Sequence, residues 1–378
     1  MKMSAKNNFK NIFYCKNCVA MSTRPRITFD NRGFCSACVW AEEKKKINWK
    51  KRKIVLNKLL AKYRSHNKQY DCIATVSGGK DGSYVAYNLK HNHKMNPLTV
   101  TIRPALETDI GVQNILSFIN SGYDHIHITP NLEAMRKLNR IGLIDMGFPY
   151  YGWLIAIHSA VFRLAVQFNI PLVFYSEDGE VEYGGDAKYK NKGVYDINYI
   201  VSRYLESGYD RVLKKARLSE VDSYWFKMPN TNELKKLKLT VTHYGFYENW
   251  DPYRNYEIAK KYCGLKENKE LNHGTYTNFA QTDQKMYDLH VYFMYIKFGF
   301  GRTTADASID VRRGAMTREQ AVQLVKMYDD FYPEYLFKEY CDYYKMNMKE
   351  FLANIDKWAN KELFKKINGV WKPKFLIS

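Results

Sequence analysis

The stretch Tyr70-Asp-Cys-Ile-Ala-Thr-Val-Ser-Gly-Gly-Lys-Asp-Gly-Ser-Tyr-Val-Ala-Tyr-Asn-Leu-Lys90 decides the fold of this 378-residue chain. Its apolar, β-branched opening over 70–76 predicts a buried strand, and its last seven residues predict a helix with an apolar face. Between them lies a Gly-rich turn from Ser77 to Ser83. Glycines let backbone N–H groups approach an anion, and the N-terminus of a helix adds a favourable dipole. The stretch therefore predicts a phosphate site, with an ordinary tight turn as the alternative.

The spacing of the turn fits neither G-x-x-x-x-G-K-[ST] nor G-x-G-x-x-G. It resembles the PP-loop, SGGxDS, of enzymes that split ATP into AMP and pyrophosphate while they adenylate a substrate oxygen. One departure is that Gly82 separates Asp81 from Ser83, which leaves the register of these two residues against the phosphates open. The residues predicted to bind ATP are Ser77, Gly78, Gly79, Lys80, Asp81, Gly82 and Ser83.

Predicted strands and helices alternate after the turn. Further strands are predicted over 98–102, 124–128 and 171–176, and helices over 82–91, 109–121, 131–140 and 152–168. This alternation predicts an α/β protein with a parallel, doubly wound sheet, of the type that the PP-loop resemblance implies. Ligands of such sheets bind at the carboxyl ends of the strands. The loops at 77–83, 103–108 and 177–186 are therefore expected to converge.

We expect three parts in the chain. Residues 1–48 form a zinc-ribbon module, 49–190 the PP-loop adenylating domain, and 191–378 a mainly helical substrate-binding and C-terminal region. Beyond residue 190 the sequence predicts helices without further strand alternation. The predicted helices lie over 253–263 and 286–298 and after Thr317, a candidate N-cap.

Four of the seven cysteines form two CxxC pairs, Cys15 with Cys18 and Cys35 with Cys38, separated by sixteen residues. This spacing is typical of a Cys₄ zinc ribbon, in which four thiolates leave no open position for substrate. We therefore predict structural Zn²⁺, with an iron–sulfur cluster as the alternative. Cys72, Cys263 and Cys341 are isolated in the sequence and are predicted to be buried small hydrophobic residues.

The formal net charge is +20. This charge fits three interpretations: nucleic-acid binding, a Lys-rich composition, or an electrostatic funnel for ATP and an anionic small substrate. The first residues lack the apolar region of a secretory signal, and the most apolar stretch, 153–166, is too short to span a bilayer. We therefore expect a cytoplasmic protein without a membrane partner.

Two further segments are candidates for chemistry. The loop 177–186 carries five carboxylates after a predicted strand, and Glu177 and Glu182 are candidate catalytic residues that hold Mg²⁺, orient ammonia or accept protons. A solvated acidic loop is the alternative.

The segment 299–314 combines glycines with Arg and Asp, and Arg302 is a candidate for stabilising charge on the transferring group. Ion pairs that cap helices are the alternative there.

These features together resemble the N-acetyl sugar amidotransferases, in particular those that act on pseudaminic-type sugars. The resemblance covers residues 15 to about 325. Its motifs are the two CxxC pairs, Thr23-Arg-Pro-Arg-Ile-Thr-Phe-Asp30, the turn Ser77 to Ser83, Glu182-Tyr-Gly-Gly185, Trp250-Asp-Pro-Tyr253 and Lys297-Phe-Gly-Phe-Gly-Arg302.

The resemblance implies an ATP-dependent conversion of an N-acetyl group into an acetamidino group on a nonulosonic or related sugar, free or nucleotide-linked, for surface or flagellin glycan synthesis. Lys80 would neutralise developing charge, and Asp81 would position a metal, a water or a loop amide. The chain has no recognisable glutaminase segment, so the resemblance implies a separate glutaminase subunit that supplies ammonia.

Two other functions compete. A tRNA-thiolating enzyme also joins a cysteine ribbon to a PP-loop, and the charge of +20 favours it. However, Cys72, Cys263 and Cys341 form no CxxC pair that would serve sulfur transfer. The other competitor is a zinc-ribbon module that binds nucleic acid and carries a degenerate nucleotide fold. We consider nucleic acid an improbable partner.

Overall fold

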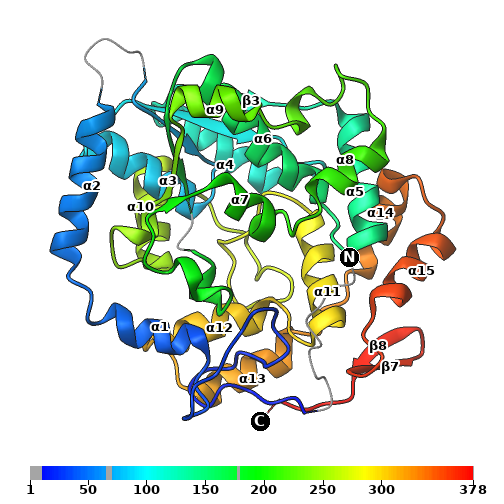
Figure 1. Ribbon diagram of the computed structural model, residues 1–378. Coiled ribbons are helices and arrows are strands. Elements are labelled where there is room, and N and C mark those ends of the chain that lie inside the picture. The colour runs from blue at the N-terminus through cyan, green and yellow to red at the C-terminus, as the bar shows by residue number, and fades with distance from the viewer. Residues whose placement is uncertain (1–10, 65–69, 177–178, 378) are drawn as a thin grey trace.

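The computed structural model describes residues 11–64, 70–176 and 179–377 (Figure 1). Its centre is a six-stranded sheet of order β3-β2-β1-β4-β6-β5. Five strands are parallel, and the short edge strand β5 runs antiparallel to β6. The strands are β1 (Cys72–Thr75), β2 (Pro97–Ile102), β3 (His125–Ile128), β4 (Leu172–Tyr175), β5 (Val194–Tyr195) and β6 (Thr240–His243). The chain is thus a mixed α/β protein.

The strand order changes direction next to β1. From β1 the chain continues outward through β2 and β3, and then returns to place β4 on the other side of β1. Ile73 of β1 lies in register with Leu98 of β2 on one side and with Val173 of β4 on the other. The connections after β1 and β4 therefore leave the sheet in opposite directions, which opens a crevice at the carboxyl ends of these two strands.

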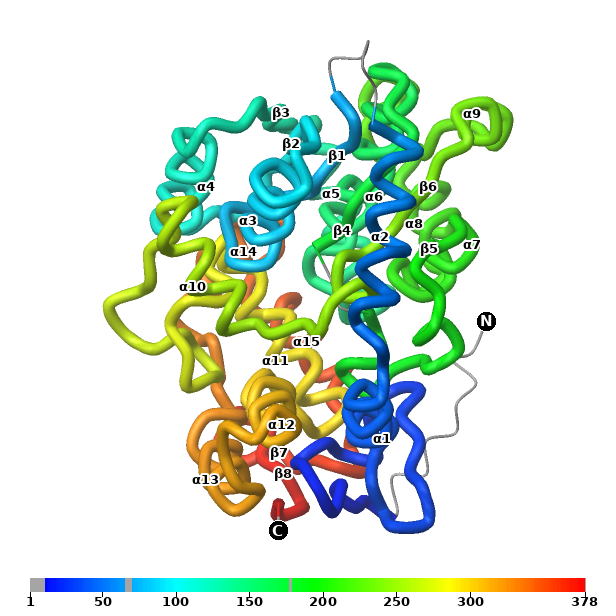
Figure 2. The backbone as a smooth tube through the Cα atoms, turned by 90° about the vertical axis from the view of Figure 1, so that its left-hand side faces the viewer, coloured from blue at the N-terminus to red at the C-terminus, as the bar shows by residue number. Residues whose placement is uncertain are grey.

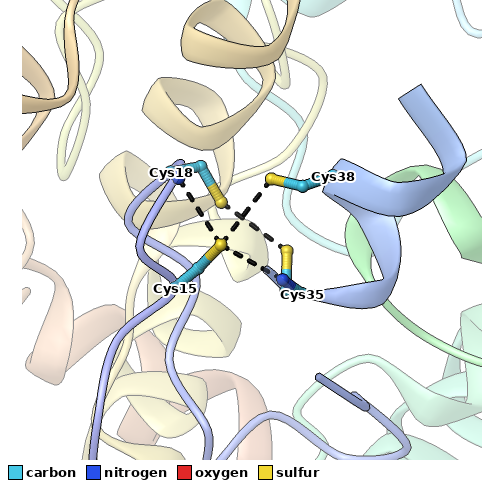
Figure 3. Close-up of side chains that lie close together, drawn as sticks. All are labelled: Cys15, Cys18, Cys35 and Cys38. Carbon is cyan, nitrogen blue, oxygen red and sulfur yellow. Dashed lines mark hydrogen bonds between the residues drawn. The ribbon is translucent and has the colours of Figure 1, made fainter. Parts of the chain in front are cut away.

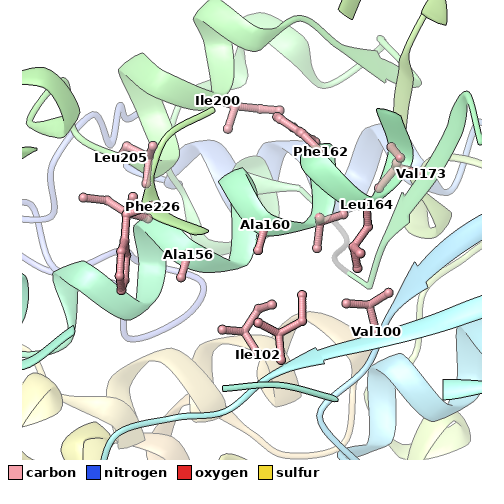
Figure 4. Packing of buried hydrophobic residues seen from close by; sticks show 14 of the residues in the cluster. Val100, Ile102, Ala156, Ala160, Phe162, Leu164, Val173, Ile200, Leu205 and Phe226 are labelled. Atoms are coloured by element: carbon pink, nitrogen blue, oxygen red, sulfur yellow. The ribbon is translucent and has the colours of Figure 1, made fainter. Parts of the chain in front are cut away.

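Helices cover both faces of the sheet, because its buried strands present apolar side chains alternately to each face. Ile73 and Val173 belong to a core shared with the helices α5 and α6, and Figure 4 shows this core between β2 and α6. Ala74 and Phe174 belong to a second core, shared with α2, α3 and α4.

The helices of eight residues or more, in chain order, are α1 (Ser36–Lys44), α2 (Trp49–Tyr63), α3 (Lys80–Tyr87), α4 (Asp109–Asn120), α5 (Leu132–Met146), α6 (Tyr151–Gln167), α8 (Tyr209–Ala216), α10 (Pro252–Cys263), α11 (Met286–Phe298), α12 (Arg302–Arg313), α13 (Arg318–Tyr328), α14 (Phe337–Tyr344) and α15 (Met348–Trp358). The shorter helices are α7 (Ile197–Tyr199) and α9 (Thr231–Leu237), and a hairpin is formed by β7 (Phe364–Ile367) and β8 (Val370–Pro373). Within the described ranges, no helix has the length and apolar character that crossing a membrane requires.

The elements predicted before residue 190 are confirmed within a few residues, but the expectation that no strand follows residue 190 is wrong. Both β5 and β6 lie beyond that position, and β6 pairs with β4 over Leu172 to Tyr175. The missed strand is the four-residue segment Thr-Val-Thr-His, whose partner is distant in the sequence. The sheet therefore draws on both sides of residue 190, and the division into domains at 48 and 190 stays a prediction.

The N-terminal residues 11–45, which we call the cysteine module, pack against the C-terminal helices. Figure 2 shows α2 running from the sheet to α1, which lies beside α12. The Arg318 guanidinium of α13 donates to the carbonyl oxygens of Cys15 and Cys18 at 3.1 and 3.2 Å. The beginning of the chain is thus attached to residues about 300 positions further on.

Candidate active site and cysteine cluster

A cavity opens at the crevice between β1 and β4, and we call it the loop cavity. It holds about 1070 Å³, counting space open to solvent. It is lined by the ends of β1, β2 and β4, by the Gly-rich turn with the first turn of α3, by α4 and α6, and by residues 280–283. Of the residues predicted to bind ATP, those that line it are Ser77, Gly79, Lys80, Asp81 and Gly82.

The Gly-rich turn lies so close to α4 that its second residue has no room for a side chain. Gly78 has φ +79°, and a Cβ atom there would lie 2.6 Å from the carbonyl carbon of Asn114. Gly79 follows as the N-cap of α3. The first backbone N–H groups of α3 have no partner within the helix. This end of the helix therefore faces the loop cavity as a region of positive potential suited to phosphate.

The structure explains the Gly82 that departs from the SGGxDS pattern. Helix α3 is continuous from Lys80, so Gly82 lies inside its first turn. A Cβ atom at this position would be 2.9 Å from Cα of Val76 and 3.1 Å from the carbonyl oxygen of Thr75. The glycine therefore lets α3 pack directly on the end of β1, and it places Asp81 and Ser83 on different sides of the helix.

Asp81 is held by two neighbouring side chains. Its Oδ1 accepts a hydrogen bond from Nδ2 of Asn255 at 2.9 Å, and its Oδ2 pairs with the Lys80 ammonium group. Asn255 belongs to α10, which packs along α3, and its side chain is fully buried. The carboxylate is thus positioned at the edge of the loop cavity by a residue that the sequence analysis did not single out.

Ser83 is turned away from the loop cavity. It is fully buried, does not line the cavity, and its Oγ atom has no hydrogen-bond partner among the described residues. Ser77, in contrast, lines the cavity at the carboxyl end of β1. The structure therefore brings Ser77 to the candidate site, whereas a contact of Ser83 with phosphate stays a prediction.

Another part of the cavity wall comes from residues 280–283, which are about 200 positions further along the chain than the Gly-rich turn. Thr108, the N-cap of α4, donates its backbone N–H to the carbonyl oxygen of Asp283 at 3.3 Å. Burial raises the pKa of the Asp283 carboxyl above its ordinary value. The loop 103–108 thus reaches the cavity through this segment, as one part of the expected convergence of loops.

Arg302 lies behind this wall. Its side chain is almost fully buried, its Nη2 donates to the carbonyl oxygen of Ala280 at 2.6 Å, and its Nε contacts Asp306 at 3.3 Å. Arg302 does not itself line the loop cavity. Its visible contacts hold residue 280 in place, and its role towards the transferring group stays a prediction.

The acidic loop lies beside the cysteine module. Glu177 lies outside the described residues. Glu182 accepts hydrogen bonds from Trp40 Nε1 and Lys44 Nζ of α1, each at 2.7 Å, and is largely buried there. Glu180 pairs with Arg26, and Asp186 with Arg203. The described carboxylates are thus engaged by protein cations, away from the loop cavity.

A second cavity, of about 390 Å³, lies next to this loop at the end of β6. Its walls include Glu180, Asp186 and an aromatic group in which the rings of Tyr195 and His243 stack with centroids 4.7 Å apart. The described residues 179–186 thus contribute to this second cavity and not to the loop cavity, so the structure does not show their expected convergence with the Gly-rich turn.

The four cysteines of the two CxxC pairs point towards one centre (Figure 3). All four are buried, and their Sγ atoms lie within 4.8 Å of one another. The Sγ atoms of Cys15 and Cys38, and those of Cys18 and Cys35, are 3.7 Å apart. A tetrahedron with Zn–S bonds of about 2.3 Å has edges of about 3.8 Å. The cluster can therefore bind zinc, and two of its six Sγ–Sγ distances already match such a tetrahedron.

Donors around the sulfur atoms suit thiolates. Cys15 Sγ accepts from the backbone N–H of Cys35 at 3.2 Å, and Cys38 Sγ accepts from Asn17 Nδ2 at 3.2 Å. Hydrogen bonds from the neighbouring cysteines lower the pKa of the Cys18 thiol, and the charge of Arg312 on α12 adds to this effect. Such surrounding donors orient the ligands of a metal site and stabilise their negative charge.

Residues 273–376 match the family model described as "LPS biosynthesis protein WbpG-like, C-terminal domain". No curated protein matches the chain. The matched segment includes α11 to α15, the hairpin of β7 and β8, and residues 280–283 of the loop cavity.

Sequence patterns identified the Gly-rich turn and the cysteines but missed Asn255 and the wall at 280–283. Asn255 is one of several polar residues in the amphipathic helix α10. The neighbouring residues do not indicate that its side chain faces inward and not solvent. The available signal was the motif Trp250-Asp-Pro-Tyr253 just before it, in which Asp251 caps α10. Residues 280–283 have neither helical nor strand periodicity and become part of a site only through tertiary contacts.

Proposed function

We propose that the chain is an ATP-dependent, AMP-forming amidotransferase that converts an N-acetyl group of a nonulosonic, pseudaminic-type or related sugar into an acetamidino group. The loop cavity would be its ATP site, of the PP-loop type. The observation that carries the proposal is the composition of this cavity. Part of its wall is a Gly-rich turn at the end of β1, and another part, 280–283, belongs to the segment that matches a family of LPS biosynthesis proteins.

The chemistry follows from the poor leaving ability of an amide oxygen. Attack of that oxygen on the α-phosphorus of ATP would form an oxygen–phosphorus bond and release pyrophosphate. Ammonia would then add to the activated carbon, and AMP would leave with the former amide oxygen. The nitrogen would lose a proton and the acetamidino group would remain. Each step conserves atoms and charge, and no redox partner is needed.

The residues of the loop cavity suit parts of this sequence. Backbone N–H groups at Gly79 and the start of α3 would hold the pyrophosphate end of ATP, with Ser77 as a hydroxyl donor. Lys80 would neutralise charge on the phosphates, and Asp81, held by Asn255, would fix the orientation of Lys80. Mg²⁺ would be bound mainly by ATP phosphates, because the described carboxylates of the acidic loop are engaged elsewhere.

Ammonia would come from a separate glutaminase subunit. The described cysteines outside the cluster, Cys72, Cys263 and Cys341, are all buried, and burial raises the pKa of each thiol. Glutaminase chemistry with a cysteine requires a reactive thiolate. We therefore expect purified chain to use ammonium chloride efficiently and glutamine poorly.

The test is AMP release from ATP with ammonium chloride, with and without pseudaminic acid or its CMP-linked form, and with the product mass read in parallel. We expect sugar-dependent AMP and a product in which NH replaces oxygen. Ser77→Ala should reduce the rate of AMP release. Ser22→Ala is the control, because Ser22 belongs to the cysteine module and does not line the loop cavity, and this variant should keep the wild-type rate. AMP release that is unaffected by any such sugar would contradict the proposal.

A tRNA-thiolating enzyme is the second candidate, favoured by the net charge of +20. Against it, no cysteine is among the described residues that line the loop cavity. Binding of tRNA that weakens steeply with salt, together with absence of sugar-dependent AMP, would favour this candidate.

A further inference from the structure

A small pocket beside the cysteine module joins three segments that are far apart in the sequence. It holds about 270 Å³ and is lined by Arg24 of the module, Tyr183 of the acidic loop, Phe300 before α12, and Ser308 and Arg312 of α12. We call it the Arg24 pocket. Each of the three segments carries a motif noted in the sequence, at 23–30, 182–185 and 297–302. The loop cavity does not account for their convergence.

Arg24 has a guanidinium group without an acceptor. Its Cζ lies 5.9 Å from the ring centroid of Tyr183 and 5.2 Å from that of Phe300. These cation–π contacts hold the group but use none of its N–H donors. Among the described residues, no carboxylate or carbonyl oxygen accepts a hydrogen bond from it. Burial lowers the pKa of Arg24 to about 10, so it still carries its charge at neutral pH.

A second donor in the pocket is also unused. Ser308 is 3% exposed, and its Oγ atom has no hydrogen-bond partner among the described residues. A buried hydroxyl without a partner costs free energy, typically about 1–3 kcal/mol. The Ser308 hydroxyl is therefore available to a ligand in the Arg24 pocket.

The remaining charged groups nearby are already engaged. Arg312 donates to the carbonyl oxygen of Glu182 at 2.6 Å and contacts Cys18 Sγ at 3.8 Å. The carboxylate that acts most strongly on Arg24 is that of Glu180, and it accepts a hydrogen bond from Arg26 at 2.7 Å. The Arg24 pocket thus presents a cation and a hydroxyl, and neither is hydrogen-bonded to a carboxylate of the described part of the protein.

We propose that the Arg24 pocket binds the carboxylate of the anionic sugar substrate, with the Arg24 guanidinium and the Ser308 hydroxyl as donors. The planar fork of arginine matches the two oxygens of a carboxylate. Helix α12 connects it to the ATP site, because Arg302 at its start holds Ala280 of the loop cavity. This inference rests on the proposed function for the identity of the ligand.

The first test measures binding of pseudaminic acid and of its uncharged methyl ester to the full chain by calorimetry. Wild type should prefer the acid by at least tenfold, and Arg24→Gln should bind both forms about equally. Ser308→Ala should reduce the preference, whereas Arg32→Gln, an exposed arginine paired with Asp30 and Glu42, should leave it intact. A preference that survives Arg24→Gln would overturn the inference.

The second test separates this inference from the proposed function. Crystals of the full chain soaked in sodium bromide should show anomalous scattering between Arg24 and Ser308 in wild type, and none there in Arg24→Gln. A bromide peak without binding of either sugar form would support an anion site and count against the sugar. Absence of the peak together with equal binding of acid and ester would overturn the site.

In turnover, Arg24→Gln should raise the KM for sugar and leave the KM for ATP unchanged.

Discussion

The amide of Asn255 on α10 donates a hydrogen bond to the carboxylate of Asp81 on α3, at 2.9 Å. These residues are 174 positions apart; Asp81 lines the loop cavity, and Asn255 lies behind it. Asp81 pairs on its other oxygen with Lys80. The relationship makes α10 a support for the Gly-rich turn and gives Asp81 a positioning role.

Asn255→Ala should therefore weaken ATP binding indirectly, through the position of Asp81. Loss of one buried hydrogen bond costs about 1–3 kcal/mol, part of which would appear as a roughly tenfold higher KM for ATP. Asn249→Ala, at a position before the same helix, is the matched control. Steady-state kinetics would measure the effect. The double variant Asn255→Ala, Asp81→Ala completes the comparison. If its loss of ATP binding equals the sum of the losses of the two single variants, the two residues act independently and this interpretation fails.

Gly82→Ala should destabilise the protein, because its Cβ would lie 2.9 Å from Val76 Cα. Moving α3 away from β1 is expected to cost about 1–3 kcal/mol. Gly79→Ala is the comparison for stability, since a Cβ there meets only Ser77 Oγ at 3.4 Å. Urea unfolding would measure both variants. Equal stability of Gly82→Ala and wild type would show that the helix does not depend on this close contact.

The cysteine cluster should contain one zinc ion per chain. Cys18→Ala should lose the metal and lower the melting temperature by roughly 5 °C or more, because metal binding stabilises only the folded arrangement of thiolates. Cys341→Ala, which removes a thiol from the C-terminal core, should keep the zinc. Elemental analysis by mass spectrometry would measure the metal. Iron with sulfide in the wild type would instead establish an iron–sulfur cluster.

His290 should make the protein sensitive to acid. Burial lowers its pKa from 6.5 to about 3, and its ring packs beside Phe148 and Tyr150. Below pH 6.5 the unfolded chain binds a proton that the folded chain excludes, so stability falls as pH decreases towards 3. The loss is about 1.4 kcal/mol per pH unit for one proton. His290→Phe should remove one proton's share of this dependence in denaturant titrations between pH 4 and 7, and the share of His125 and His158, whose pKa values burial also lowers, should remain. An unchanged slope would mean that the folded protein also binds the proton.

The sequence predicted those features that depend on local patterns. The strand and helix around Ser77 to Ser83 follow from apolar periodicity, and the capping box that begins α13 follows from Thr317 and Gln320. The cysteine cluster follows from spacing alone, and the structure confirms that its members meet.

Features that depend on distant contacts were not predictable in this way. The strand β6 has four residues and is defined by pairing with β4. Glu182 was chosen as a catalytic candidate because it follows a strand, yet its contacts are Trp40 and Lys44 of the cysteine module. Arg24 belongs to the motif at 23–30, but the motif does not show which residues it contacts. Its significance comes from the rings of Tyr183 and Phe300, which lie more than 150 positions away.

The most direct test of the proposed reaction follows the amide oxygen. Pseudaminic acid labelled with ¹⁸O in its N-acetyl carbonyl would be incubated with the chain, ATP and ammonium chloride, and the AMP would be analysed by mass spectrometry. Adenylation of the amide oxygen predicts that the label moves into the phosphate of AMP while the sugar gains NH. Unlabelled AMP, or sugar that keeps its label, would contradict the central claim.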